Sequence, residues 1–226
     1  MLKSVVGSLI FVSLISLPYV DEPLVAWGQI PPAVPSGVVV NGGNCPDSKS
    51  LPITQEKQRS VSWCWATAAT IVMHYLGGAQ EQCFVVDAVR QNQLGIYSPN
   101  TCCIANPDMT PGCGNVLDFS WAALNEFNFA YDTAGESNFG WPELREQICR
   151  DGPIVYGEDY MDGGGHEYVI YGFIEDRTTG ERTVVFYDPL DDPKNYREES
   201  YDTWLRLQTN PSEIRSNVEF LINIRK

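Results

Sequence analysis

The chain has 226 residues, of which 43% are hydrophobic and 19% are charged, so it is long enough for one domain with a buried core. Its formal net charge is −14, and no cluster of basic residues interrupts this acidity. Proteins that bind nucleic acid normally present a basic face, so we expect no nucleic-acid partner.

The first 28 residues have the pattern of a secretory signal peptide. Lys3 supplies a positive start, residues 5–20 are mostly apolar, and Ala26 and Gly28 are small residues at the positions that a signal peptidase reads. The segment holds one basic and two acidic residues, so its removal changes the charge from −14 to −13. The alternative is an uncleaved anchor, but the run is short for a span of about 20 residues. We expect a secreted or periplasmic protein without stable membrane association after cleavage.

The cysteine content fits an exported protein. An odd number leaves at least one cysteine without an intramolecular partner. If Cys64 is the free one, the other six can form three disulfides, in about 15 possible connectivities that the sequence does not distinguish. Zinc binding by Cys102, Cys103 and Cys113 is a weaker interpretation, because no histidine lies near them and adjacent cysteines are not a usual zinc spacing. We expect neither a metal nor an organic cofactor. The seven cysteines are Cys45, Cys64, Cys83, Cys102, Cys103, Cys113 and Cys149.

Residues 29–50 are rich in proline and glycine, which predicts an extended lead-in, and residues 51–226 are predicted to form one domain. The first predicted helix begins at Cys64, contains mostly small and apolar residues, and ends at Gly77. Ser60 or Ser62 is expected to cap its N-terminus with a side-chain oxygen.

A second helix is predicted from near residue 82 to residue 93. The next segment, 97–116, is a long loop with prolines, glycines and three cysteines, and it would need disulfides to keep one shape. Further helices are predicted over residues 118–127 and from Trp141 to about residue 151, the latter with a proline in its first turn.

Four strands are predicted in the rest of the chain, over residues 153–156, 167–174, 183–187 and 218–224, with the three glycines at 163–165 forming a loop. Because the helices come first and the strands later, the predicted class is α+β. The helix that begins at Cys64 is expected to pack on the C-terminal antiparallel sheet.

Cys64 is the candidate nucleophile. It lies between two tryptophans at the expected start of a helix. A thiol attacks as its thiolate, and the positive end of a helix and a nearby imidazolium both favour that form. The alternative for Cys64 alone is a buried packing residue or half of a disulfide.

Only two histidines can supply a base. His74 follows Cys64 by ten residues on the same helix, which puts their backbones about 15 Å apart. We therefore expect His74 to have a structural role. His166 is the remaining candidate, predicted at the start of a strand beside a groove; the alternative is a surface histidine.

Asp188 is the candidate partner of His166. The two strands after His166 are predicted to form a hairpin with its tip between residues 176 and 180, which sets His166 opposite Asp188 within about two residues. A carboxylate there can orient the imidazole. Asp191 and Asp192 are the fallback candidates, and an ordinary Asp-Pro turn is the structural alternative.

The oxyanion that forms during acyl transfer needs hydrogen-bond donors. The backbone N–H of Cys64 is one candidate. The side-chain amide of Gln58, six residues upstream, is the other. Gln55 is its fallback, and an exposed glutamine without a catalytic role is the alternative.

Gln58, the spacing to Cys64-Trp65 and the helix that follows resemble the papain-like cysteine peptidases. The segments around His166 and Asp188 look more like a compact bacterial branch, which includes bacteriocin-leader-processing peptidases and a secreted effector protease. The resemblance covers roughly residues 52–225, and its specific matches are three short blocks. It implies Cys64 as nucleophile, His166 as base, Asp188 as orienting residue and Gln58 as oxyanion donor.

We therefore predict a secreted thiol peptidase that hydrolyses peptide or protein substrates through a Cys-His-Asp triad and a thioester. The same triad would serve a transglutaminase, an amidase or a deamidase. The remaining alternative is a non-enzymatic, disulfide-stabilised binding domain in which Cys64 is inert. Substrate preference and oligomeric state are left open.

Overall fold

A computed structural model describes residues 45–93, 95, 101–114, 116, 118–135, 139–160, 164–204 and 215–226, without the side chains of 215–217. The predicted signal peptide and most of the predicted lead-in lie outside these residues. Within the described part of the chain, no helix is long and apolar enough to cross a membrane.

The described residues form an α+β fold, as predicted. Its helices are α1 Cys64–Tyr75, α2 Gln82–Asn92, the 3-10 helix η1 Pro107–Met109, α3 Ser120–Glu126 and α4 Trp141–Cys149. Its strands are β1 Ser48–Ser50, β2 Ala130–Gly135, β3 Ile154–Tyr160, β4 Gly164–Glu175, β5 Arg182–Tyr187, β6 Arg197–Ser200 and β7 Arg215–Arg225.

All strand pairs are antiparallel and belong to one sheet, in the order β2-β7-β3-β4-β5-β6. The long strand β4 pairs with β3 along its first half and with β1 along its second half. Gly172 allows β1 to come close, because a Cβ on Gly172 would lie 2.9 Å from the carbonyl oxygen of Lys49. β1 falls in the last residues of the predicted lead-in.

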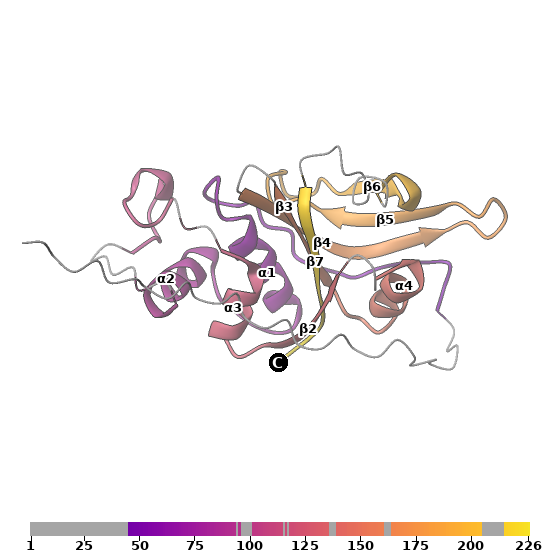
Figure 1. Ribbon diagram of the computed structural model, residues 1–226, viewed down its shortest axis with the longest axis horizontal. Helices are drawn as coiled ribbons and strands as arrows, with labels where there is room; N and C mark the ends of the chain where they lie inside the picture. Colours follow the sequence, from indigo (N-terminus) through magenta and orange to yellow (C-terminus); the bar gives the residue numbers. More distant parts are fainter. Residues whose placement is uncertain are drawn as a thin grey trace, which may run out of the picture. The chain divides into compact units, whose positions relative to one another are not determined.

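The helix α1 is the centre of the core. Every residue from Cys64 to Met73 is buried, because the sheet and the helices α2 and α3 pack around α1. α1 packs on β3 and β4 of the sheet, and α2 and α3 pack on α1. In Figure 1 these three helices lie together, and α4 lies apart from them beneath β4. The prediction that the helix beginning at Cys64 packs on an antiparallel sheet is confirmed.

Some local predictions are wrong. Neither Ser60 nor Ser62 caps α1: the N-cap residue is Trp63, without a side-chain capping bond. The hydroxyl of Ser60 instead donates to Asp108, because the loop that follows α2 folds back against this turn. Gly164 and Gly165 belong to β4, so His166 is its third residue rather than the first residue after a loop.

Three disulfides form among the six cysteines other than Cys64, which is free and buried. Cys45–Cys149 ties the N-terminal end of the described chain to the end of α4. The other two, Cys83–Cys103 and Cys102–Cys113, close the loop that follows α2. This loop was predicted to need disulfides, and it has two.

Candidate active site

Cys64 is the first residue of α1. The first amides of an α-helix have no acceptor within the helix, so the N-terminus carries a partial positive charge that favours an anion such as a thiolate. The turn before the helix is held by its tryptophans: the indole N–H of Trp63 donates to the carbonyl of Cys113 (3.0 Å), and that of Trp65 donates to the carbonyl of Val116 (3.1 Å). Cys64 therefore lies on a fixed helix end.

His166 reaches both of its expected neighbours. Its Nε2 lies 2.7 Å from Oδ1 of Asp188, and its side chain also hydrogen-bonds the thiol of Cys64. Because Asp188 occupies Nε2, the other ring nitrogen, Nδ1, is the one left for Cys64. The imidazole also packs edge-on against the ring of Tyr168, with centroids 4.6 Å apart. These contacts fix the ring between a thiol and a carboxylate.

The charges of the site favour an imidazolium. Burial alone would lower the pKa of His166, but the contacts with Asp188 and Cys64 outweigh burial and raise the pKa to about 9. Burial would raise the pKa of Asp188, but its bonds to His166 and to the amide of Leu190 bring that pKa below its ordinary value. At neutral pH the pair is therefore a carboxylate and an imidazolium.

The hairpin explains how His166 and Asp188 meet. β4 and β5 pair from Glu175 with Arg182 to Val169 with Tyr187, and Asp188 follows directly after this last pair. The chain turns between Asp176 and Glu181, as predicted, with the amide of Asp176 donating to the carbonyl of Glu181. The predicted approach of the two side chains, within about two residues of register, is what the structure has.

Gln58 is buried in the segment before α1 and makes a local bond. Its Nε2 donates to the carbonyl of Ser60 (2.8 Å), and its Oε1 is buried without a hydrogen-bond partner among the described residues. Its backbone N–H donates to the carbonyl of Pro189 (2.8 Å), which fixes the segment before α1 beside Asp188. The carbonyl of Ser60 accepts one of the two N–H bonds of this amide.

The fallback candidates have other partners. Oε1 of Gln55 accepts from the amide of Lys194 (2.7 Å). Asp191 accepts two hydrogen bonds from Arg197, and Asp192 pairs with Lys57 (2.7 Å). The structure thus brings Asp188, rather than Asp191 or Asp192, to His166, and it joins Gln58 to Pro189, next to Asp188.

His74 is remote from this site, as expected. Near the C-terminal end of α1, its Nε2 contacts the carbonyl oxygen of Gln80 (2.7 Å) and its Nδ1 contacts Glu56 (2.8 Å). It joins the segment before α1 to the segment after it, which is a structural role.

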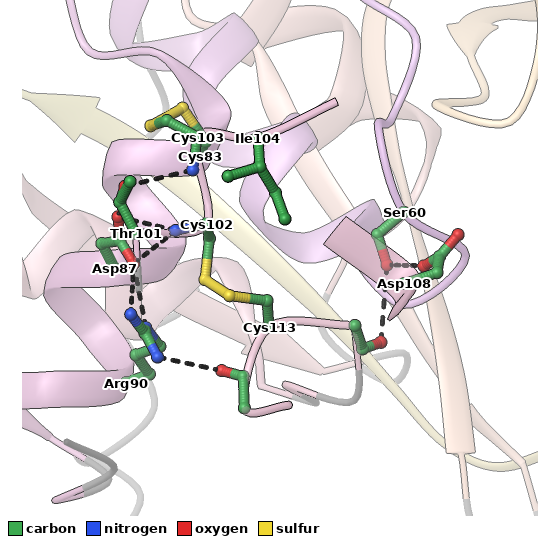
Figure 2. The surroundings of a disulfide bond; sticks show 12 residues. Ser60, Cys83, Asp87, Arg90, Thr101, Cys102, Cys103, Ile104, Asp108 and Cys113 are labelled. Carbon is green, nitrogen blue, oxygen red and sulfur yellow. Dashed lines mark hydrogen bonds and ion pairs between the residues drawn. A yellow bond between two sulfur atoms is a disulfide. The ribbon is translucent and has the colours of Figure 1, made fainter. Parts of the chain in front are cut away.

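The nearest arrangement to a metal site in the described residues is Asp87 with Cys102 and Cys113. Both sulfurs belong to one disulfide, so neither is a thiolate ligand. Asp87 instead accepts from the amide of Cys102 (3.0 Å) and pairs with Arg90 (2.8 Å). These side chains close the loop and do not fit a metal (Figure 2).

Sequence reasoning missed two charged residues near the site. Glu167, next to His166 but on the opposite face of β4, accepts from the amide of Ser120 (3.0 Å). Arg197, the first residue of β6, contacts Asp188 (2.9 Å). Alternation along the strand could have placed Glu167 on the face packed against the helices. No sequence signal marks Arg197, because its contact depends on where the loop before β6 returns.

A comparison with known proteins identifies a family that this chain matches. A model described as "Peptidase_C39 like family" matches residues 50–211. A search of the curated proteins finds no match. Among solved structures, this chain is similar to "Crystal structure of UfSP from C.elegans", with 9% identity and a TM-score of 0.41 over 84% of this chain and 36% of that one. The chain thus spans about a third of the length of that structure.

Proposed function

Because the chain belongs to the Peptidase_C39 like family and is therefore a papain-like cysteine peptidase, we propose that Cys64, His166 and Asp188 are its catalytic triad. They would hydrolyse peptide bonds through a thioester on Cys64. The observation that carries this proposal is the contact chain from the one free cysteine through His166 to Asp188.

The proposed reaction begins with attack of the Cys64 thiolate on the carbonyl carbon of the substrate. The tetrahedral intermediate collapses, the C–N bond breaks, and the His166 imidazolium gives its proton to the leaving amine. Neutral His166 then takes a proton from water, which attacks the thioester. The acid product leaves, and the thiolate and imidazolium are restored. Asp188 keeps the ring oriented throughout.

Two donors would stabilise the oxyanion that forms in each half of the reaction. The first is the backbone N–H of Cys64, at the N-terminus of α1. The second is the free N–H bond of Gln58, whose amide is already oriented by its bond to Ser60. Removing one side-chain amide donor from the oxyanion hole of a serine protease lowers kcat by about 100- to 1,000-fold.

We further propose that the protein acts outside the cytoplasm. Three disulfides support this, because such bonds persist in oxidising compartments. The predicted signal peptide over residues 1–28 agrees with it. The substrate would be a peptide or protein, and the resemblance to leader-processing peptidases and effector proteases makes both substrate types candidates.

The test compares Cys64→Ala with the wild type on a peptide library, with product masses measured. We expect hydrolysis by the wild type and none by the variant, while His74→Ala, which changes a histidine outside the site, keeps wild-type kcat. Wild-type turnover by Cys64→Ala would refute the proposal. Products joined to an added amine, rather than hydrolysed, would make the protein an acyltransferase.

A further inference from the structure

We propose that Arg197 is a positioning residue of this site, holding Asp188 in the orientation in which it accepts the hydrogen bond of His166. The proposal rests on the proposed function of the triad and adds a fourth side chain that does not touch substrate.

The carboxylate of Asp188 is held at both oxygens. Oδ1 accepts from Nε2 of His166 (2.7 Å) and from the amide of Leu190 (2.9 Å). Oδ2 pairs with Nη2 of Arg197 at 2.9 Å. Rotation of the carboxylate away from His166 would therefore break the contact with Arg197 as well. Without Arg197, the amide of Leu190 would still hold Oδ1, but Oδ2 would lose its contact.

Arg197 is itself held in place. Its Nε and Nη2 donate to the two oxygens of Asp191, at 2.8 and 3.0 Å. Paired N–H bonds to one carboxylate fix the plane of the guanidinium as well as its position. Nη2 also contacts Asp188, so one nitrogen bridges the two carboxylates. On the sheet, Arg197 is anchored by β6, where it pairs with Phe186 of β5.

The burial of the partners separates this contact from an ordinary surface ion pair. The side chain of Asp188 is 5% exposed, whereas that of Arg197 is 46% exposed. Arg197 thus brings a charge from the surface to a buried carboxylate. Without Arg197, Asp188 stays bonded to His166 and to the amide of Leu190, so we expect the larger effect in the reaction rather than in the melting temperature.

The charge of Arg197 also bears on the ionisation of Asp188. Burial raises the pKa of this carboxyl, and His166 from β4, the amide of Leu190 and Arg197 from β6 lower it. The other charged groups on the turn are Asp191, which is paired with Arg197, Asp192, which is paired with Lys57, and Lys194. Without the guanidinium, Asp188 would take up a proton at a higher pH and release His166.

The experiment compares Arg197→Ala and Arg197→Lys with Arg177→Ala. Arg177 is a matched control, because it pairs with Asp47 at an exposed position in the hairpin turn. We expect Arg197→Ala to lower kcat about tenfold with KM unchanged, since only the orientation of the base is lost. Lysine keeps the charge without the fork and should give an intermediate kcat. Added guanidinium should restore part of the activity of Arg197→Ala.

A second readout does not need turnover. Cys64 is the single free thiol, so the rate of its alkylation by iodoacetamide against pH follows the thiolate alone. We expect the acid limb of this profile to move to higher pH in Arg197→Ala and to stay in place in Arg177→Ala.

The inference would be overturned if Arg197→Ala had the same pH profile of alkylation and the same kcat as Arg177→Ala. If the wild type cleaves no peptide but the alkylation profile still moves, the proposed function fails and the role of Arg197 stands. If Arg197→Ala does not fold, Arg197→Lys and Asp191→Asn decide: a lower kcat with a shifted profile supports the inference, and wild-type behaviour of both overturns it.

Discussion

At the scale of single residues, His166 determines how the proposed activity should depend on pH. Its pKa is raised to about 9, because the contacts with Asp188 and Cys64 outweigh the effect of burial. The imidazolium that would protonate the leaving amine in the proposed reaction is thus present at neutral pH and is lost as the pH rises through about 9. The stability that its charge contributes is complete below its ordinary pKa and disappears over the same upper range.

We predict that kcat/KM falls on the alkaline side with a midpoint near pH 9, as a profile over pH 6–10 would measure. In Asp188→Asn the same limb should move to lower pH, because the carboxylate that favours the imidazolium is gone. An alkaline limb near the ordinary value of a histidine, about 6.5, in the wild type would contradict this assignment.

Glu167 is a buried carboxyl that the proposed chemistry does not use. Burial raises its pKa to about 7, although its bonds to Ser120 act in the other direction. The hydroxyl of Ser120 contacts both Glu167 and the carbonyl of Trp65, and it has a single proton for two acceptors. A protonated Glu167 that donates to Ser120, with Ser120 donating to Trp65, satisfies every atom. This relay joins β4, α3 and the nucleophile helix.

We predict that Glu167→Gln removes a pH dependence of folding stability. A raised pKa means that the wild type loses stability as the pH rises from about 4.5 to above 7, by up to about 3 kcal/mol. The N–H of glutamine replaces the O–H donor of the protonated carboxyl and does not titrate, so the difference in unfolding free energy between variant and wild type should grow over that range. Urea unfolding at pH 5 and pH 8 measures it; a constant difference would contradict the relay.

At the scale of elements, the loop after α2 supports the turn before the nucleophile. Figure 2 shows the Cys102–Cys113 disulfide in this loop and, beside it, Asp108 in contact with Ser60. Since Trp63 also donates to the carbonyl of Cys113, the turn that holds Gln58 and Cys64 rests on a covalently closed segment.

We predict that the double variant Cys102→Ala/Cys113→Ala loses stability and activity together. A loop of this length contributes about 3 kcal/mol when closed by a disulfide. Because the loop contacts Ser60 and Trp63, kcat should also fall severalfold at temperatures where the variant is folded. Thermal melting and peptidase assays measure the two effects, and an unchanged kcat would mean that the turn holds its shape without the loop.

The elements that the sequence predicted are those with strong local signals. α1 has its run of small apolar residues and its terminal glycines, and β4 and β5 have long apolar runs joined by a short turn. The three missed strands are short or polar: β1 is Ser48–Ser50, β2 is Ala130–Gly135 and β6 is Arg197–Ser200. Each pairs with a longer strand of the sheet. Such strands have no period of their own to detect.

The candidate site shows the same difference between residues with local sequence signals and residues placed by distant contacts. Cys64, His166 and Asp188 could be found because only two histidines exist and one hairpin fixes the distance between two of the three. The capping serines failed because Ser60 bonds Asp108, a residue 48 positions away. Arg197 could not be found, because its position depends on the path of the loop that leaves Asp188 and returns at β6.

At the scale of the whole molecule, the Cys45–Cys149 disulfide closes a long stretch of chain without approaching the site. The bonded cysteines are 104 positions apart. β1, which follows Cys45, pairs with β4 at Gly172–Ile174, whereas His166 lies near the other end of that strand. Eight residues of strand separate His166 from Ile174, or about 26 Å.

We therefore predict opposite behaviour for Cys45→Ala/Cys149→Ala and for the loop variant. Closing a loop of about 100 residues contributes about 4.7 kcal/mol, so this pair should lower the melting temperature more than the shorter disulfide does. Its kcat, measured well below the melting temperature, should equal that of the wild type, because nothing that holds Cys64, His166 or Asp188 is removed. A loss of kcat matching that of Cys102→Ala/Cys113→Ala would mean that the site depends on the stability of the whole domain, and not on local support from the loop.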